Sequence, residues 1–183
     1  MIEETAPALG AVVETDRGSL PFTLIHGEAL VACATWALGE AGVVPVDFTT
    51  TWETITEAEE PFVLHDSLCP MTPAEFIARC VETAVERDAV VVAVRPVTDT
   101  VKTVAGGLVG DTIDRSELVE VTSPIVLPPA VVETFSQAPA GDFATIASEL
   151  AERFPVVMVQ APAAGRRVAD LADVRLLEAL TQG

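Results

Sequence analysis

Ala89-Val90-Val91-Val92-Ala93-Val94 is the stretch that decides the fold class of this chain. The run is apolar, unbroken and mostly β-branched, which is typical of a parallel strand covered by helices on both faces of its sheet. Short apolar runs of the same kind predict four further strands, at residues 8–13, 43–48, 61–64 and 156–160.

Helical patterns separate these strands. Gly42 stands where the first helix is predicted to end, and Thr72 and Asp170 are the predicted N-terminal caps of two later helices. Strands that alternate with helices predict one three-layer α/β domain over residues 1–183, with a mostly parallel sheet. The predicted helices lie at residues 29–41, from 73 onward, at 144–154 and from 170 to 180.

The charge balance excludes two classes of partner. The chain has 28 acidic and 10 basic residues, a formal net charge of −18, and Lys102 as its one lysine. Such a field repels nucleic acids and anionic membranes. No apolar run is long enough to span a bilayer, and the acidic start lacks the basic residues of a signal peptide. A cytoplasmic protein is therefore expected.

The cysteines do not indicate a structural zinc site. The chain has three cysteines, none of them in a C-x-x-C pair, and two histidines. Cys69 lacks a matched base motif, which disfavours a nucleophilic role.

Polar residues follow two of the predicted strands. His65 and Asp66 come after one strand, and residues 96–99 come after the strand at 89–94. Ligands bind beyond the carboxyl ends of parallel strands, so Asp66 and Asp99 are expected near one edge of the sheet.

Four ordered motifs carry a resemblance to a known family. Residues 63–66 and 70–73 resemble an H-D-A-A-R-P segment, and residues 96–102 resemble P-V-x-D-T-[IV]-K. Residues 112–118 are similar to T-V-D-R-x-x-L, and residues 121–124 occupy the position of a Q-T-P-Q segment. Over residues 60–182, and more weakly before them, the chain therefore resembles the methylerythritol phosphate cytidylyltransferases.

The resemblance implies a fold, ligands and a partner. The fold is a Rossmann-like, nucleotide-diphospho-sugar transferase-like domain, whose residues 102–121 form a protruding β-arm that embraces a second subunit in a homodimer. The ligands are CTP and a sugar-alcohol phosphate, with Mg²⁺ as cofactor if the protein is active. By resemblance, Asp66 holds the metal, Arg17 and Arg167 contact phosphates, and the acceptor binds Asp99, Thr100, Lys102, Arg115 and Ser123.

The loop after the first strand departs from the family. The family has a glycine-rich loop that ends in a basic residue and is followed by a proline-lysine pair. Here residues 14–22 keep one glycine, introduce Glu14 and Asp16, and have no lysine after Pro21. Arg17 is the one candidate cation of this loop, and acidic groups in it repel phosphates.

Two further departures lie elsewhere. Cys69 replaces the arginine of the H-D-A-A-R-P segment, and Arg167 stands near the position of a lysine in the family's N-I-K-[VI]-T segment. Residues 46–60 are shorter than in the family, lack its serine-bearing nucleotide contact, and receive no assigned element.

Three functions stay open. The first is a relative with weak or lost transfer, because each lost cation costs about 3 to 4 kcal/mol of transition-state stabilisation. The others are an active cytidylyltransferase and a non-catalytic dimeric binding module, with another nucleotide specificity as a weaker choice. Asp66 could equally cap a turn, the arm residues could serve packing alone, and His65 is expected to be a structural hydrogen-bond partner rather than a base.

Overall fold

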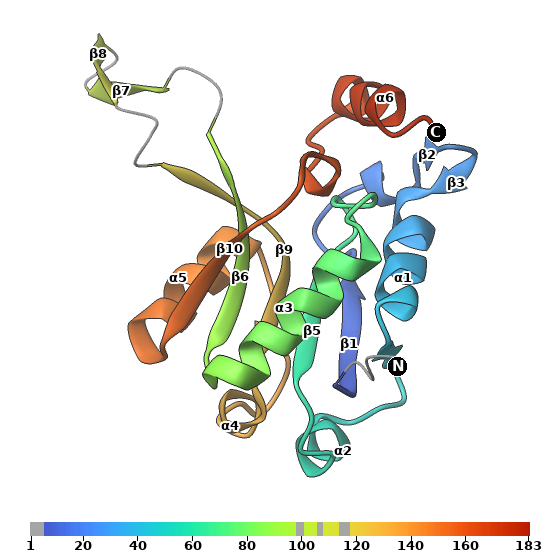
Figure 1. Cartoon of the computed structure of the whole chain (residues 1–183). Helices are drawn as coiled ribbons and strands as arrows, with labels where there is room; N and C mark the ends of the chain where they lie inside the picture. Colours follow the sequence, from blue (N-terminus) through green and yellow to red (C-terminus); the bar gives the residue numbers. More distant parts are fainter. Residues whose placement is uncertain (1–5, 98–100, 106–107, 114–117) are drawn as a thin grey trace.

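The computed structural model describes residues 6–97, 101–105, 108–113 and 118–183. A six-stranded sheet runs through it in the order β10-β6-β9-β5-β1-β4 (Figure 1). All its neighbouring strands are parallel except β9, which pairs antiparallel with both β5 and β6. The mostly parallel sheet is therefore confirmed. Its strands are β1 (Ala8–Val13), β4 (Val43–Pro45), β5 (Phe62–Asp66), β6 (Val90–Pro96), β9 (Val119–Leu127) and β10 (Val156–Gln160).

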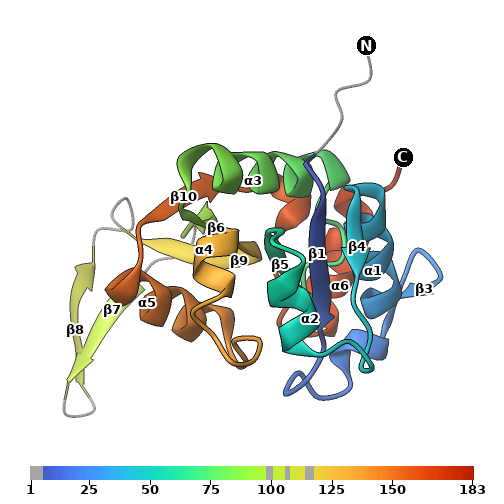
Figure 2. The same cartoon turned by 90° about the horizontal axis from the view of Figure 1, so that it is seen from below.

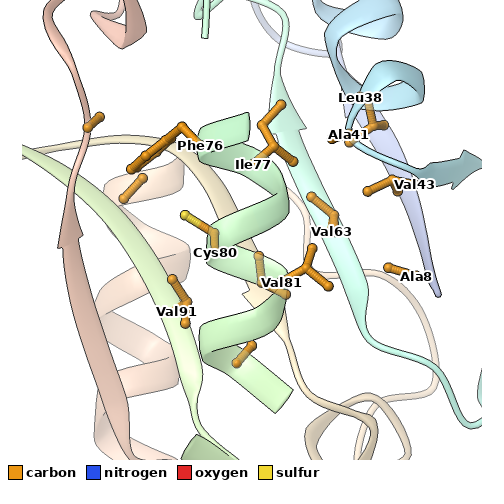
Figure 3. Close-up of a cluster of buried hydrophobic side chains, with 14 residues drawn as sticks. Ala8, Leu38, Ala41, Val43, Val63, Phe76, Ile77, Cys80, Val81 and Val91 are labelled. Carbon is orange, nitrogen blue, oxygen red and sulfur yellow. The ribbon is translucent and has the colours of Figure 1, made fainter. Parts of the chain in front are cut away.

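Helices cover both faces of the sheet, which gives the predicted three layers (Figure 2). Alternate residues of a strand point to opposite faces. Val63 accordingly packs with α3 (Ala74–Arg87) and α1 (Leu30–Glu40), whereas Phe62 and Leu64 pack on the other face. Figure 3 shows the apolar side of α3, including Phe76, Ile77, Cys80 and Val81, turned toward the strands. The second face is covered by α2 (Trp52–Glu57), α4 (Pro129–Val132) and α5 (Phe143–Arg153).

A third cluster of buried side chains closes the carboxyl end of the sheet. It joins α6 (Leu171–Leu180) to the segment before α1, through Ile25, Leu30, Val174 and Leu177. That segment contains a 3-10 turn, η1 (Leu20–Phe22), and a small antiparallel pair, β2 (Leu24–Ile25) with β3 (Glu28–Ala29). The cluster holds α6 against the loops that leave β1 and β5.

The predicted helix boundaries had mixed outcomes. Gly42 has φ 83° and follows α1, and the Asp170 side chain accepts the backbone N–H of Asp173 at 2.9 Å, so both predictions are confirmed. The predicted cap at Thr72 is wrong: Pro73 is the N-cap of α3, and the Thr72 hydroxyl donates to the carbonyl of Cys69.

Two elements differ from the sequence prediction. The strand predicted at residues 43–48 ends at Pro45, and the unassigned stretch contains α2, which Thr51 caps through the backbone N–H of Thr54. Residues 119–127 form β9, so the predicted arm ends before this strand of the main sheet.

The arm itself is a two-stranded hairpin. β7 (Val101–Ala105) and β8 (Leu108–Ile113) pair antiparallel and stand apart from the six-stranded sheet (Figure 1). The predicted turn at residues 106–107 lies outside the described residues.

Within the described part of the chain, every helix is too short or too polar to cross a membrane.

Candidate functional site

The carboxyl ends of β1, β5, β6 and β10 meet at one edge of the sheet, as parallel strands require. Because β9 runs the other way, it begins at this edge. Asp66 is the last residue of β5 and is fully buried there. Its predicted position at a strand end is confirmed, whereas Asp99 lies outside the described residues.

Two arginines engage the Asp66 carboxylate from different parts of the chain. Its Oδ1 accepts the Nε–H of Arg17 at 2.9 Å and the backbone N–H of Leu68 at 2.9 Å. Its Oδ2 accepts the Nε–H of Arg167 at 3.0 Å and a longer bond from the Nη2 of Arg17 at 3.4 Å. We call Arg17, Asp66 and Arg167 the arginine–aspartate triad.

Arg17 forms the buried side of the triad. Its side chain is 4% exposed, and it also donates to the carbonyls of Thr15 at 2.6 Å and Gly141 at 3.3 Å. The guanidinium lies 5.5 Å from the centre of the Phe143 ring. Arg17 thus ties the loop after β1 to β5 and to the start of α5, and this engagement leaves it little capacity for the phosphate contact predicted from the sequence.

Arg167 forms the open side of the triad. Its side chain is 28% exposed, and within the described residues only its Nε–H has a hydrogen-bond partner. The neighbouring Val168 is buried and donates its backbone N–H to Leu68 at 2.8 Å. Arg167 is therefore held in place at its backbone, while its partly exposed side chain lines a cavity of about 280 Å³, which fits the predicted phosphate contact.

Charge in the triad is fixed at neutral pH. Burial alone would raise the pKa of Asp66, but the hydrogen bonds and positive charges of Arg17 and Arg167, with the Leu68 N–H, outweigh it and lower that pKa. Burial likewise works to lower the pKa of Arg167, and the bond to Asp66 reverses this effect and raises it. Two guanidinium cations thus flank one carboxylate.

His65 and Ser123 form a buried polar pair behind the triad. Both are fully buried, with His65 Nδ1 and Ser123 Oγ 2.6 Å apart, and Ser123 Oγ also accepts the backbone N–H of Asp66 at 2.8 Å. Burial lowers the pKa of His65 to about 4, against the opposing effect of the Asp66 charge. His65 has the structural role expected of it. The Ser123 hydroxyl is enclosed and holds β5 to β9, and its predicted substrate contact stays a prediction.

The remaining predicted residues fall into two groups. Lys102 lies in β7, opposite Thr112, and its acceptor role stays a prediction. Asp99, Thr100 and Arg115 lie outside the described residues. Separately, Cys69 is fully buried, and burial raises its pKa well above the ordinary value, which agrees with an unreactive thiol.

A divalent metal ion does not fit Asp66 in this arrangement. Magnesium is bound by carboxylate and other oxygen ligands at about 2.0–2.1 Å. Both carboxylate oxygens of Asp66 already accept guanidinium hydrogens, and two cations beside it would repel a third. Within the described residues, no three His, Cys, Asp or Glu side chains gather in one group.

Sequence reasoning missed two arginines at the same edge. Arg95, near the end of β6, and Arg166 line a cavity of about 280 Å³ together with Arg167. Arg95 directly follows the buried run at 89–94, so its place at a strand end was a usable signal. Arg166 had no sequence signal of its own apart from its place beside Arg167.

Comparison with known proteins gives a consistent picture. The family model of 2-C-methyl-D-erythritol 4-phosphate cytidylyltransferase (IspD) matches residues 49–170. The chain is 31% identical over 170 residues to the cytidylyltransferase of Corynebacterium diphtheriae, covering 88% of the chain and 64% of the relative. It is 36% identical over 103 residues to that of Corynebacterium glutamicum, covering 55% and 37%. Each match thus spans less than two thirds of the relative's own length.

Solved structures support the same fold. The crystal structure of 2-C-methyl-D-erythritol 4-phosphate cytidylyltransferase from Thermus thermophilus aligns with a TM-score of 0.66 at 21% identity, over 93% of this chain and 96% of that one. The 4-diphosphocytidyl-2C-methyl-D-erythritol synthase of Anaerococcus prevotii aligns with a TM-score of 0.66 at 14% identity, over 98% and 99%. At these identities the likeness concerns the fold alone.

Proposed function

Because the chain belongs to the 2-C-methyl-D-erythritol 4-phosphate cytidylyltransferase family, we propose that it is a relative that binds a phosphorylated ligand while its CTP-dependent transfer is weak or lost. One observation carries the proposal. The resemblance assigns Asp66 to the metal ion and Arg17 to the triphosphate, but these two side chains are bonded to each other within the protein. Arg167 is bonded to the same carboxylate.

The loop after β1 supports the same proposal. Glu14 and Asp16 are both exposed there, at the carboxyl end of β1. Like charges beside an incoming triphosphate raise the cost of binding, and transfer of a nucleotidyl group depends chiefly on positive groups positioned around its phosphates. Phe22, which is exposed after Pro21, offers no positive charge where the family has a lysine.

The roles of the triad follow from its geometry. Arg167 meets the anionic ligand from the cavity side, and Asp66 holds its guanidinium in orientation. Arg17 anchors the loop after β1 through Gly141 and Asp66.

We also propose a homodimer, located in the cytoplasm, and the arm supports the dimer. An isolated two-stranded hairpin is marginal in water, so β7 and β8 need a surface on which to pack. A two-fold partner supplies the same surface to each arm. An active cytidylyltransferase and a purely scaffolding dimer are the alternatives.

Pyrophosphate release tests the proposal. The protein is mixed with CTP, Mg²⁺ and methylerythritol phosphate, and release is compared with a reaction that lacks protein. We expect no excess release at micromolar protein, while the Thermus thermophilus relative in the same buffer serves as a positive control. Release that needs both substrates and disappears in Asp66→Ala would show that the active alternative is correct.

A further inference from the structure

An apolar pocket that contains no residue of the triad opens between α1, the β2–β3 pair and the start of α3 (Figure 1). Its volume is about 390 Å³, which lies within the ~300–1,000 Å³ usual for small-molecule sites. Its walls are mostly apolar and include Ile25, Ala37, Pro70 and Met71. We call this space the α1 pocket.

Trp36 lines the α1 pocket with most of its indole in solvent. It is 69% exposed, although tryptophan is on average a highly buried residue. Its Nε1 donates to Glu40 Oε1 at 3.3 Å, one turn further along α1, and this bond holds the indole in one orientation. Among aromatic side chains, the indole attracts a cation over its ring most strongly.

The neutral polar side chains around the α1 pocket already have partners. The Thr72 hydroxyl donates to the carbonyl of Cys69 at 2.9 Å. His26 Nε2 lies 2.7 Å from Thr181 Oγ1, so the imidazole is engaged with α6. These groups therefore have little hydrogen-bonding capacity left for a ligand.

Two carboxylates remain, Glu28 from β3 and Glu40 from α1. Both residues are exposed, and within the described part of the chain neither forms a salt bridge. The Glu28 charge acts on the pocket wall, because it adds to the effect of burial in raising the pKa of Cys33. The groups free to meet a ligand are thus two negative charges and one indole.

Anionic ligands are disfavoured at the α1 pocket. Among the described residues that line it there is no arginine or lysine, and the chain around it has a net charge of −18. The start of α3 has the partial positive charge of a helix N-terminus, but Glu75 in its first turn offsets that charge. The carboxylates of Glu28 and Glu40 therefore favour a cation.

We propose that the α1 pocket binds a small organic ammonium compound with an apolar body. The apolar walls contact the body, while Trp36, Glu28 and Glu40 surround the ammonium group. A space of about 390 Å³ holds one ring-sized body, which favours a small molecule over an extended peptide. The site shares no residue with the triad, so the inference does not rest on the proposed function.

Phenethylammonium is a suitable probe, and 2-phenylethanol, which has the same body without the charge, is its matched neutral control. Ligand-observed NMR titrations at constant ionic strength, without CTP, give both affinities. We expect saturable binding of the ammonium compound, at least about 5-fold tighter than binding of the alcohol, from two partly solvated ion pairs and one cation–π contact.

Glu28→Gln and Glu40→Gln should each weaken ammonium binding about 2- to 5-fold and leave alcohol binding unchanged. Glutamine keeps the size of the side chain and, at position 40, an acceptor for the Trp36 N–H, but it lacks the charge. Glu82→Gln is the matched control, because Glu82 is exposed on α3 and does not line the pocket. Thermal unfolding confirms that each variant is folded.

Trp36 supplies a second readout. The chain has two tryptophans, and the other, Trp52, lies in α2 and does not line the α1 pocket. A ligand that covers Trp36 should shift the fluorescence emission to shorter wavelength. The Trp36→Leu variant should lose this shift, and it should weaken ammonium binding more than alcohol binding.

Several results would overturn the site. Ammonium binding that does not saturate, or that is no tighter than alcohol binding, would refute the proposed ligand class. Unchanged ammonium affinity in both glutamine variants would remove the carboxylates from the site. Saturable binding of a lysine-rich peptide, with phenethylammonium silent, would show that the partner is a protein instead. Each of these outcomes is independent of pyrophosphate release.

Discussion

Asp66→Asn tests the arginine–aspartate triad most directly. The substitution keeps the size of the side chain but removes the one negative charge between Arg17 and Arg167. Breaking a buried ion pair by removing one partner costs about 3–5 kcal/mol of unfolding free energy, because the other charge stays buried and unpaired. Arg17 meets that condition at 4% exposure, whereas Arg167 at 28% is partly solvated and adds less.

The expected loss is large enough to measure by thermal unfolding. For a chain of this size each kcal/mol shifts Tm by about 2–4 °C, so Asp66→Asn should lower Tm by roughly 6–20 °C. Glu82→Gln is the matched control, since Glu82 is exposed on α3 and carries the same charge. Adding Arg17→Gln to Asp66→Asn should cost less than the two single losses together, because the pair is coupled.

The pH dependence gives the triad an independent signature. The folded-state pKa of Asp66 lies below its ordinary value of 3.8. A carboxylate shifted in this direction stabilises the fold above its unfolded-state pKa, and that stabilisation is lost as the pH falls through the folded pKa. The stability difference between the wild type and Asp66→Asn should therefore shrink below about pH 4. A variant within about 0.5 kcal/mol of the wild type at pH 7 would refute the reasoning.

Three further predictions concern the fold and the assembly. His65 has a pKa of about 4 in the folded protein, against 6.5 ordinarily, so it takes up a proton in the unfolded chain first. The free energy of unfolding should therefore fall by up to roughly 3 kcal/mol as the pH falls from 6.5 to 4. Denaturant titrations of His65→Gln should lack this pH dependence. Gly10→Ala should destabilise the fold by about 1–3 kcal/mol, because the new Cβ would lie 2.8 Å from Val43 Cγ1 and 2.9 Å from a β5 carbonyl oxygen. Gly39→Ala, in open space on α1, should instead raise Tm. Equal effects of the two substitutions would contradict the close packing at Gly10. Light scattering should give about twice the 19.2 kDa chain mass, and deleting residues 104–112 should yield folded monomers; a monomeric full chain would end the dimer proposal.

The layered fold could be predicted because its signals are local. The run at 89–94, its shorter counterparts and the helices between them each bury a face that their own spacing reveals. β9 was missed because its identity depends on pairing with β5 and β6, and because Ser123 and Pro124 interrupt its apolar pattern. The predicted cap at Thr72 is wrong because its hydroxyl donates to the nearby carbonyl of Cys69 instead.

The site could be located but not assembled from the sequence. The rule that ligands bind at strand ends placed Asp66 correctly, because that rule needs only the strand. Its partners Arg17 and Arg167 lie 49 and 101 residues away, and no local pattern joins them to a buried carboxylate. The resemblance therefore implied two phosphate contacts, and the structure adds that one of the two, Arg17, is buried and hydrogen-bonded within the protein.

The pairing of Pro96 with Val119 makes the arm an insertion between two adjacent strands of the sheet. β6 and β9 would meet equally well across a turn of a few residues, since their register does not depend on what connects them. Closing the present long connection costs about 1.5 kcal/mol more chain entropy than closing such a turn. As far as chain entropy is concerned, the core would thus be more stable with a short turn in place of the arm, so the arm does not serve the folding of the core.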